Sequence, residues 1–227
     1  MKTDSYNDKS APVKYWDKEA NGFDRIYAPD GSVKGVLNRI FRRDMEGRFR
    51  FALARACVAS HPDILEIGCG SGVHTRAFLD AGASTVTGVD LSPRMLAIAS
   101  ERLSANPDYA GRATLIKGDF MSLPADAARP LNRTFDAATI IGVFDYIADP
   151  EAFLKKALEL APARVIATFP RDGTLRSHIR RVRLSLKGCP VYFYSRGRIE
   201  ALAAACGASV AEMEIIGQLY CAEFNYA

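Results

Sequence analysis

The stretch "ILEIGCGSG", Ile64 to Gly72, decides the fold of this chain. A short apolar run carries an acidic residue near its end and continues into glycines at every second position, 68, 70 and 72. Glycine reaches backbone conformations closed to other residues and lets the main chain approach a ligand. The stretch therefore predicts a buried strand that ends in a ligand-binding loop.

The glycine spacing separates three kinds of loop. A dinucleotide site requires G-x-G-x-x-G, and Val73 stands where its third glycine would be. A phosphate-binding P-loop requires Lys followed by Ser or Thr after the last glycine, and neither is present. The observed order, E-x-G-x-G-x-G with Glu66 first, favours a different ligand.

Downstream of the loop, strand-like and helix-like segments alternate, which indicates an α/β fold with a parallel sheet and helices on both faces. We expect strands over 63–68, 84–90, 113–119, 135–142 and 164–170, with helices near 73–81, 93–104, 122–128 and 150–160. A later helix starts at a Ser195 cap and stops at Gly207. The runs 208–216 and 219–227, joined by "GQ", predict a closing hairpin, so the sheet is mixed.

The N-terminal part has a different pattern. From Val33 to about Ser60 an apolar residue recurs every four positions, which predicts a helix with one core-facing side. A shorter helix is expected around 13–25. We therefore divide the chain into an N-terminal helical cap, 1–59, and a main domain, 60–227.

Composition narrows the class of protein. The five cysteines are odd in number, scattered and without a C-x-x-C pair, so neither a disulfide framework nor a metal site is expected. The chain shows no apolar signal core and no run long enough to span a membrane, and we expect a cytoplasmic protein. A net charge of +4 is too small to indicate a nucleic-acid partner.

Two further strand ends carry acidic residues suited to a nucleoside. Asp90 lies about 20 residues beyond the glycine loop, where a carboxylate can accept hydrogen bonds from ribose hydroxyls. In "GDF", Asp119 can accept from a base amino group while the backbone N–H of Phe120 donates to a ring nitrogen. Leu91 or Met95 can pack on the base.

Together these segments resemble the class I S-adenosylmethionine (SAM)-dependent methyltransferases. The likeness covers about residues 60–227 and rests on "ILEIGCGSG" (64–72), "VTGVDLSPRML" (86–96), "KGDF" (117–120) and "FDAATIIGVFDYI" (135–147). It implies a Rossmann-like, doubly wound sheet of seven strands whose last strand is antiparallel, with SAM as cofactor and S-adenosylhomocysteine (SAH) as product.

The resemblance also assigns roles to residues. Gly68, Gly70 and Gly72 would line the methionine half of SAM, with Glu66 around its amino group. Asp90 would bind the ribose, Asp119 with Phe120 the adenine, and Ile141 and Gly142 would offer backbone near the methionine.

Candidates for a general base follow strand four or lie within the basic stretch after strand five. Asp145, Tyr146 and His178 are suited to removing a proton if the acceptor must lose one. Each has a structural alternative, namely a helix-start aspartate, a packing tyrosine or a solvated histidine.

Acceptor recognition is expected at two places. The segment 15–27 resembles a lid over SAM, with Tyr15, Phe23 and Tyr27 closing on the ligands, or else a helix packed on the domain edge. Residues 171–187, within a basic insert around 171–195, carry a net charge of about +5. Arg176, Arg180 and Arg183 would recognise an anionic or lipid-like acceptor, with peripheral membrane contact as one form of this. The alternative is a solvated face.

The sequence thus predicts an enzyme that methylates a small molecule on oxygen or nitrogen. The C-terminal layout loosely resembles that of magnesium-protoporphyrin and ubiquinone-pathway O-methyltransferases. An RNA or protein methyltransferase and a non-catalytic SAM-binding partner subunit remain alternatives. Val73 and the "GDF" segment disfavour an NAD oxidoreductase. The oligomeric state is left open.

Overall fold

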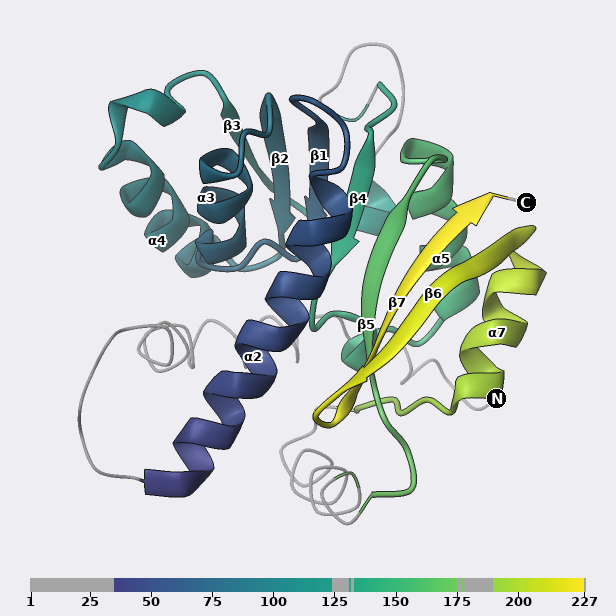
Figure 1. Cartoon of the computed structure of the whole chain (residues 1–227). Helices are drawn as coiled ribbons and strands as arrows, with labels where there is room; N and C mark the ends of the chain where they lie inside the picture. The colour runs from purple at the N-terminus through teal and green to yellow at the C-terminus, as the bar shows by residue number, and fades with distance from the viewer. Residues whose placement is uncertain (1–34, 124–130, 132, 175–176, 178–189, 227) are drawn as a thin grey trace, which may run out of the picture.

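The computed structural model of the chain describes residues 35–123, 131, 133–174, 177 and 190–226. These residues form one seven-stranded sheet in the order β3-β2-β1-β4-β5-β7-β6 (Figure 1). The strands are β1 (Asp63–Ile67), β2 (Thr85–Asp90), β3 (Ala113–Lys117), β4 (Ala137–Ile140), β5 (Val165–Pro170), β6 (Ala208–Ile216) and β7 (Leu219–Tyr226).

The first five strands run parallel, and β7 pairs antiparallel with both β5 and β6. This confirms the expected mixed sheet with an antiparallel last strand. The strand order reverses beside β1, so the loops after β1 and β4 diverge at the carboxyl edge of the sheet. Such a switch point opens a crevice in which α/β proteins bind their ligands.

Helices cover both faces of the sheet (Figure 1). One face carries α2 (Gly35–Ala56), α3 (Val73–Asp80) and α4 (Pro93–Ser104), and the other carries α5 (Pro150–Leu160) and α7 (Arg196–Ala205). Successive strand residues point to opposite faces. In β1, Ile64 therefore packs with α2 and α3, whereas Leu65 and Ile67 pack with α5 and α7.

The helix boundaries follow local capping. Ser195 accepts a hydrogen bond from the backbone N–H of Arg198, and Gly207 follows α7 with a φ of 67°. Both ends of this helix were predicted, because a serine side chain satisfies free N–H groups and glycine adopts the left-handed turn. The predicted 33–60 helix is α2, and its residues Met45, Phe51, Ala52 and Ala56 are buried in the core.

Some expectations differ from the structure or fall outside it. The fourth strand is shorter than predicted, Ala137–Ile140 instead of 135–142, because the chain turns at Gly142 with a φ of 74°. The helix expected over 122–128 does not begin at residue 122, because a single 3₁₀ turn, 120–122, ends there and Leu123 is extended; residues 124–130 lie outside the described residues. The expected 13–25 helix also lies outside them. Within the described ranges, no helix combines the length and apolarity that a membrane crossing requires.

Candidate cofactor and acceptor site

The glycine loop connects β1 to α3 and has an unusual backbone. Gly68, Gly70 and Gly72 all have positive φ, at 79°, 53° and 72°. A Cβ at position 72 would lie 2.9 Å from the Cβ of Ala99 in α4, so a side chain here would push the two helices apart. A Cβ at position 70 would meet no atom within 4 Å. The middle glycine therefore faces open space, as a ligand-binding loop requires.

Asp90, at the end of β2, holds this loop in place. Its Oδ2 accepts a hydrogen bond of 2.8 Å from the backbone N–H of Gly70, and its Oδ1 accepts one of 2.8 Å from Ser92. The predicted strand-end carboxylate and the predicted loop thus meet directly. Carboxylate oxygens also accept hydrogen bonds from hydroxyl groups of the kind that a ribose carries.

Glu66 lies one residue before the end of β1 on the α2–α3 face and is 2% exposed. Its Oε2 accepts a hydrogen bond of 2.5 Å from the hydroxyl of Thr75. Burial raises the pKa of Glu66 to about 8; the Thr75 hydrogen bond lowers it and the nearby Asp90 charge raises it. The carboxyl group is therefore protonated at neutral pH, because burial without a close cation disfavours the charged form.

His74, the second residue of α3, borders the same carboxyl group. Burial, and then the charge of Arg48, lower the pKa of His74 to about 3. Its Nδ1 lies 3.7 Å from Oε1 of Glu66, but a neutral imidazole beside a protonated carboxyl is not an ion pair. The imidazole stacks on the ring of Phe49 in α2, with centroids 4.9 Å apart. Helix α2 therefore forms one wall of the site.

Arg48 of α2 is a site residue that the sequence analysis did not single out. Its Nε is buried without a hydrogen-bond partner, and no described carboxylate forms an ion pair with it. Its Nη1 lies 3.8 Å from the position of a Cβ on Gly142. A half-buried guanidinium without an anion at a sheet edge is suited to a carboxylate ligand. The sequence shows Arg48 only as one of several arginines on a helix.

The end of β4 supplies backbone to the same edge. The N–H of Gly142 donates a hydrogen bond of 2.8 Å to the hydroxyl of Thr168 in β5. The backbone of Ile141 and Gly142 is expected near the methionine part of the cofactor. The N–H of Gly142 is already bonded to Thr168. The backbone carbonyls of Ile141 and Gly142 remain as the acceptors expected there.

The adenine side shows a mixture of predicted and unexpected contacts. Asp119 accepts from the backbone N–H of Met121 and from the Ser122 hydroxyl. The Phe120 ring is 4% exposed and packs in the core, so this residue has only its backbone to offer a base. The Nζ of Lys156 in α5 donates to the carbonyls of Phe120, Met121 and Leu123 and secures this turn.

The two apolar candidates beside the base differ in exposure. Leu91 is 37% exposed at the start of the loop after β2, whereas Met95 is 3% exposed within α4. The exposed leucine is therefore the better placed of the two to pack on a base.

The candidate bases after β4 lie in the 3₁₀ turn Phe144–Tyr146. Asp145 is 5% exposed, and its carbonyl accepts a hydrogen bond of 2.8 Å from the backbone N–H of Tyr192. Tyr146 is half-buried. The chain before α7 is thus held against the expected acceptor side.

Arg171, at the start of the basic insert, adds a second cation to this side of the sheet. Its guanidinium lies 5.5 Å from the ring centroid of Tyr220, and its Nε is buried without a hydrogen-bond partner. Its backbone N–H donates to the carbonyl of Gln218 in the hairpin turn. The remaining predicted lid and acceptor residues lie outside the described residues: Tyr15, Phe23, Tyr27, Arg176, His178, Arg180 and Arg183.

Metal and cysteine chemistry is not indicated by the described part of the chain. There, no group of three or more His, Cys, Asp or Glu side chains is placed to hold a metal ion. The four described cysteines, at 57, 69, 206 and 221, are free. Burial, followed by the charges of Glu66 and Asp90, raises the pKa of Cys69, which keeps this thiol protonated beneath the loop.

Comparisons with known proteins agree with this geometry. Residues 64–161 match a family model described as a methyltransferase domain. The chain is 34% identical over 129 residues to the mitochondrial ubiquinone biosynthesis O-methyltransferase of Schizosaccharomyces pombe, covering 52% of this chain and 44% of that protein. It is 30% identical over 155 residues to a demethylmenaquinone methyltransferase of Tropheryma whipplei, covering 66% and 62%. The chain therefore spans less than two thirds of both relatives.

A solved structure shares the whole architecture. The magnesium protoporphyrin IX methyltransferase of Synechocystis PCC 6803, with bound SAH, superposes with a TM-score of 0.75 over 97% of this chain and 100% of that one. The two sequences are 21% identical, so this likeness establishes the fold.

Proposed function

Residues 64–161 form a class I methyltransferase domain, and from this premise we propose that the chain transfers a methyl group from SAM to a small-molecule acceptor. The observation that carries the proposal is the pairing of Asp90 with the glycine loop. Its carboxylate holds Gly70 at 2.8 Å, while the space above that glycine is open. The nucleoside part of SAM would bind at the end of β2 and its methionine part over the loop. The Asp90 carboxylate lies where these two parts would meet.

The side chains around the loop fit the two ends of such a cofactor. Arg48 would hold the carboxylate of the methionine part, because its guanidinium lies at the sheet edge and forms no ion pair with a described carboxylate. The carbonyl of Gly142 and the Glu66 carboxyl would accept from its amino group. Asp90 would accept from the ribose hydroxyls, and Asp119 from the adenine amino group.

SAM, when bound, supplies a methyl group made electrophilic by its sulfonium. The protein then has mainly to align donor and acceptor, and positioning of this kind lowers barriers by about 7–11 kcal/mol. Asp145 and Tyr146 follow β4 at the expected acceptor side. Either would take a proton from a hydroxyl or amine acceptor within hydrogen-bond distance.

The acceptor side favours a molecule with an apolar ring and an anionic or hydroxyl group. Half-buried Tyr192 and Tyr220 pack against the core there, and Arg171 lies over Tyr220. The two relatives above are named as a ubiquinone biosynthesis O-methyltransferase and a demethylmenaquinone methyltransferase. These names support a ring-bearing acceptor. The expected arginines in 176–183 would add to this recognition.

The proposal is tested by incubating the protein with methyl-labelled SAM and three acceptor pools: phenolic and carboxylate-bearing quinone precursors, total RNA, and a protein extract. We expect label in the small-molecule pool. Label only in RNA or protein would overturn the acceptor class, and failure to bind SAH would overturn the cofactor assignment.

A further inference from the structure

We propose that Arg55 is a positioning residue for the cofactor site, because it ties α2 to the β6–β7 hairpin and so fixes the place of Arg48. The inference rests on the proposed function, in which Arg48 holds the cofactor carboxylate. The β6–β7 hairpin carries none of the residues expected to contact the cofactor. Through Arg55 it would nevertheless influence cofactor affinity.

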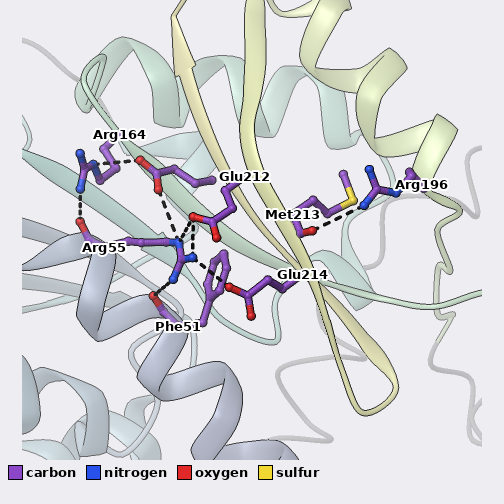
Figure 2. A network of polar contacts seen from close by, with 8 residues as sticks. Phe51, Arg55, Arg164, Arg196, Glu212, Met213 and Glu214 are labelled. Atoms are coloured by element: carbon purple, nitrogen blue, oxygen red, sulfur yellow. Dashed lines mark hydrogen bonds and ion pairs between the residues drawn. The ribbon is translucent and has the colours of Figure 1, made fainter.

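The contacts of Arg55 form a dense ionic cluster on the hairpin (Figure 2). Its Nη2 lies 2.5 Å from Glu212 and 3.0 Å from Glu214, and its Nε lies 3.6 Å from Glu223. Arg164, just before β5, bonds to Glu223 at 3.1 Å and donates to the carbonyl of Arg55 at 2.5 Å. The end of α2 is thus bound to β6, to β7 and to the residue before β5 through directional contacts.

The ionic cluster around Arg55 is partly buried, which distinguishes it from a set of exposed ion pairs. The Arg55 side chain is 16% exposed and that of Glu223 is 10% exposed, while Glu212 and Glu214 are about half exposed. The guanidinium also lies 3.6 Å from the ring centroid of Phe51. A charged group enclosed in this way has a defined position, unlike an exposed ion pair, which is worth little.

Arg48 and Arg55 lie on the same side of α2. They are seven residues apart, which in a helix is about two turns, or roughly 10 Å along one face. Both arginines lie near the same residue: burial raises the pKa of the Cys221 thiol in β7, and the charges of Arg48 and Arg55 each act against that rise. A Cβ at Gly47, next to Arg48, would lie 2.6 Å from Cγ2 of Ile216 in β6. The helix therefore runs along the hairpin with little clearance.

Apolar packing alone leaves the rotation of α2 weakly fixed. Phe51, Ala52 and Ala56 are buried, but burial of apolar surface is not directional. The ionic cluster fixes the rotation of α2, because the Arg55 guanidinium has to contact carboxylates on β6 and β7 at the same time. Any rotation or shift that loosens Arg55 also moves Arg48 relative to Gly142.

The experiment is a double-mutant cycle read out by SAH affinity in the full chain. R48M, R55M and R48M/R55M are titrated with SAH by calorimetry. We expect R48M to weaken binding at least tenfold and R55M to weaken it about three- to tenfold, the usual range for coupling through packed elements. In the R48M background, R55M should have no further effect, because Arg55 acts through Arg48.

Two additional variants keep the test decisive. If R55M does not fold, E212Q/E214Q loosens the same cluster at its exposed side and should show the same dependence on Arg48. R196A is the matched control, since Arg196 of α7 contacts the Met213 carbonyl on the same strand and should leave SAH affinity unchanged (Figure 2). Equal losses from R55M in both backgrounds, or no loss in either, would overturn the proposal. Absence of SAH binding by the wild-type chain would instead overturn the proposed function.

Discussion

The hydroxyl of Thr75 donates a hydrogen bond of 2.5 Å to the carboxyl group of Glu66, within the wall of the candidate cofactor site. Helix α3 provides the donor and β1 the acceptor, so this contact joins the helix to the strand just beneath the glycine loop. The carboxyl group is nonetheless held with its proton, because burial outweighs the single hydrogen bond. Because Glu66 keeps this proton, the stability of the protein should depend measurably on pH.

The free energy of unfolding should fall as pH rises from about 6.5 to 8. The pKa of Glu66 is raised from 4.5 to about 8, so between these values the folded state keeps a proton that the unfolded state has lost. His74, whose pKa is lowered from 6.5 to about 3, has the opposite effect below 6.5 and offsets Glu66 there. The remaining loss is about 2 kcal/mol.

Urea unfolding of the wild type and E66Q at several pH values measures this loss. E66Q cannot ionise, and its stability relative to the wild type should therefore increase between pH 6.5 and 8. T75V should move the upper end of the window to higher pH, since Thr75 lowers the pKa. Parallel pH profiles for wild type and E66Q would show that Glu66 is ionised in the folded protein.

Substitution of Gly70 by alanine should impair cofactor binding far more than folding. The φ of 53° costs an alanine about 1 kcal/mol, and no atom lies within 4 Å of the new Cβ. The methyl group would enter the space proposed for the ligand, so SAH affinity should fall at least tenfold. Gly82, with a φ of 95° and equally open surroundings outside the site, is the control. G82A should lose similar stability and keep its SAH affinity; equal affinities for both variants would place the cofactor elsewhere.

Removal of the Thr168 hydroxyl should destabilise the protein by about 1 kcal/mol and weaken SAH binding. In T168V the N–H of Gly142 loses its acceptor, and an unsatisfied part-buried donor is costly. Thr139, also fully buried on the same face, has a hydroxyl without a hydrogen-bond partner. T139V should therefore be neutral or stabilising in thermal unfolding. A larger loss in T139V than in T168V would contradict this account of the β4 end.

Contacts that depend on the local sequence pattern could be predicted. Contacts that depend on how a helix is placed against the sheet could not. Gly70 and Asp90 were predicted because their spacing along consecutive strands determines where both must lie at the sheet edge. Arg48 was not, since the 33–60 periodicity shows which side of α2 faces the core and leaves open which arginine reaches the end of β4. Thr75 has no sequence signal beyond a helix start. The strand expected over 135–142 was predicted too long, because periodicity does not show that the chain turns at Gly142 and that the strand ends at Ile140.

Titration of the purified chain with SAH and, separately, with NAD measures whether the glycine loop and Asp90 bind the methyltransferase cofactor. We expect SAH to bind at one site per chain and D90N to weaken this binding at least tenfold, because the amide has one acceptor oxygen where the carboxylate has two. We expect no competition from NAD, because the dinucleotide fingerprint is broken at Val73. Binding of NAD in place of SAH, or SAH binding untouched by D90N, would contradict these expectations.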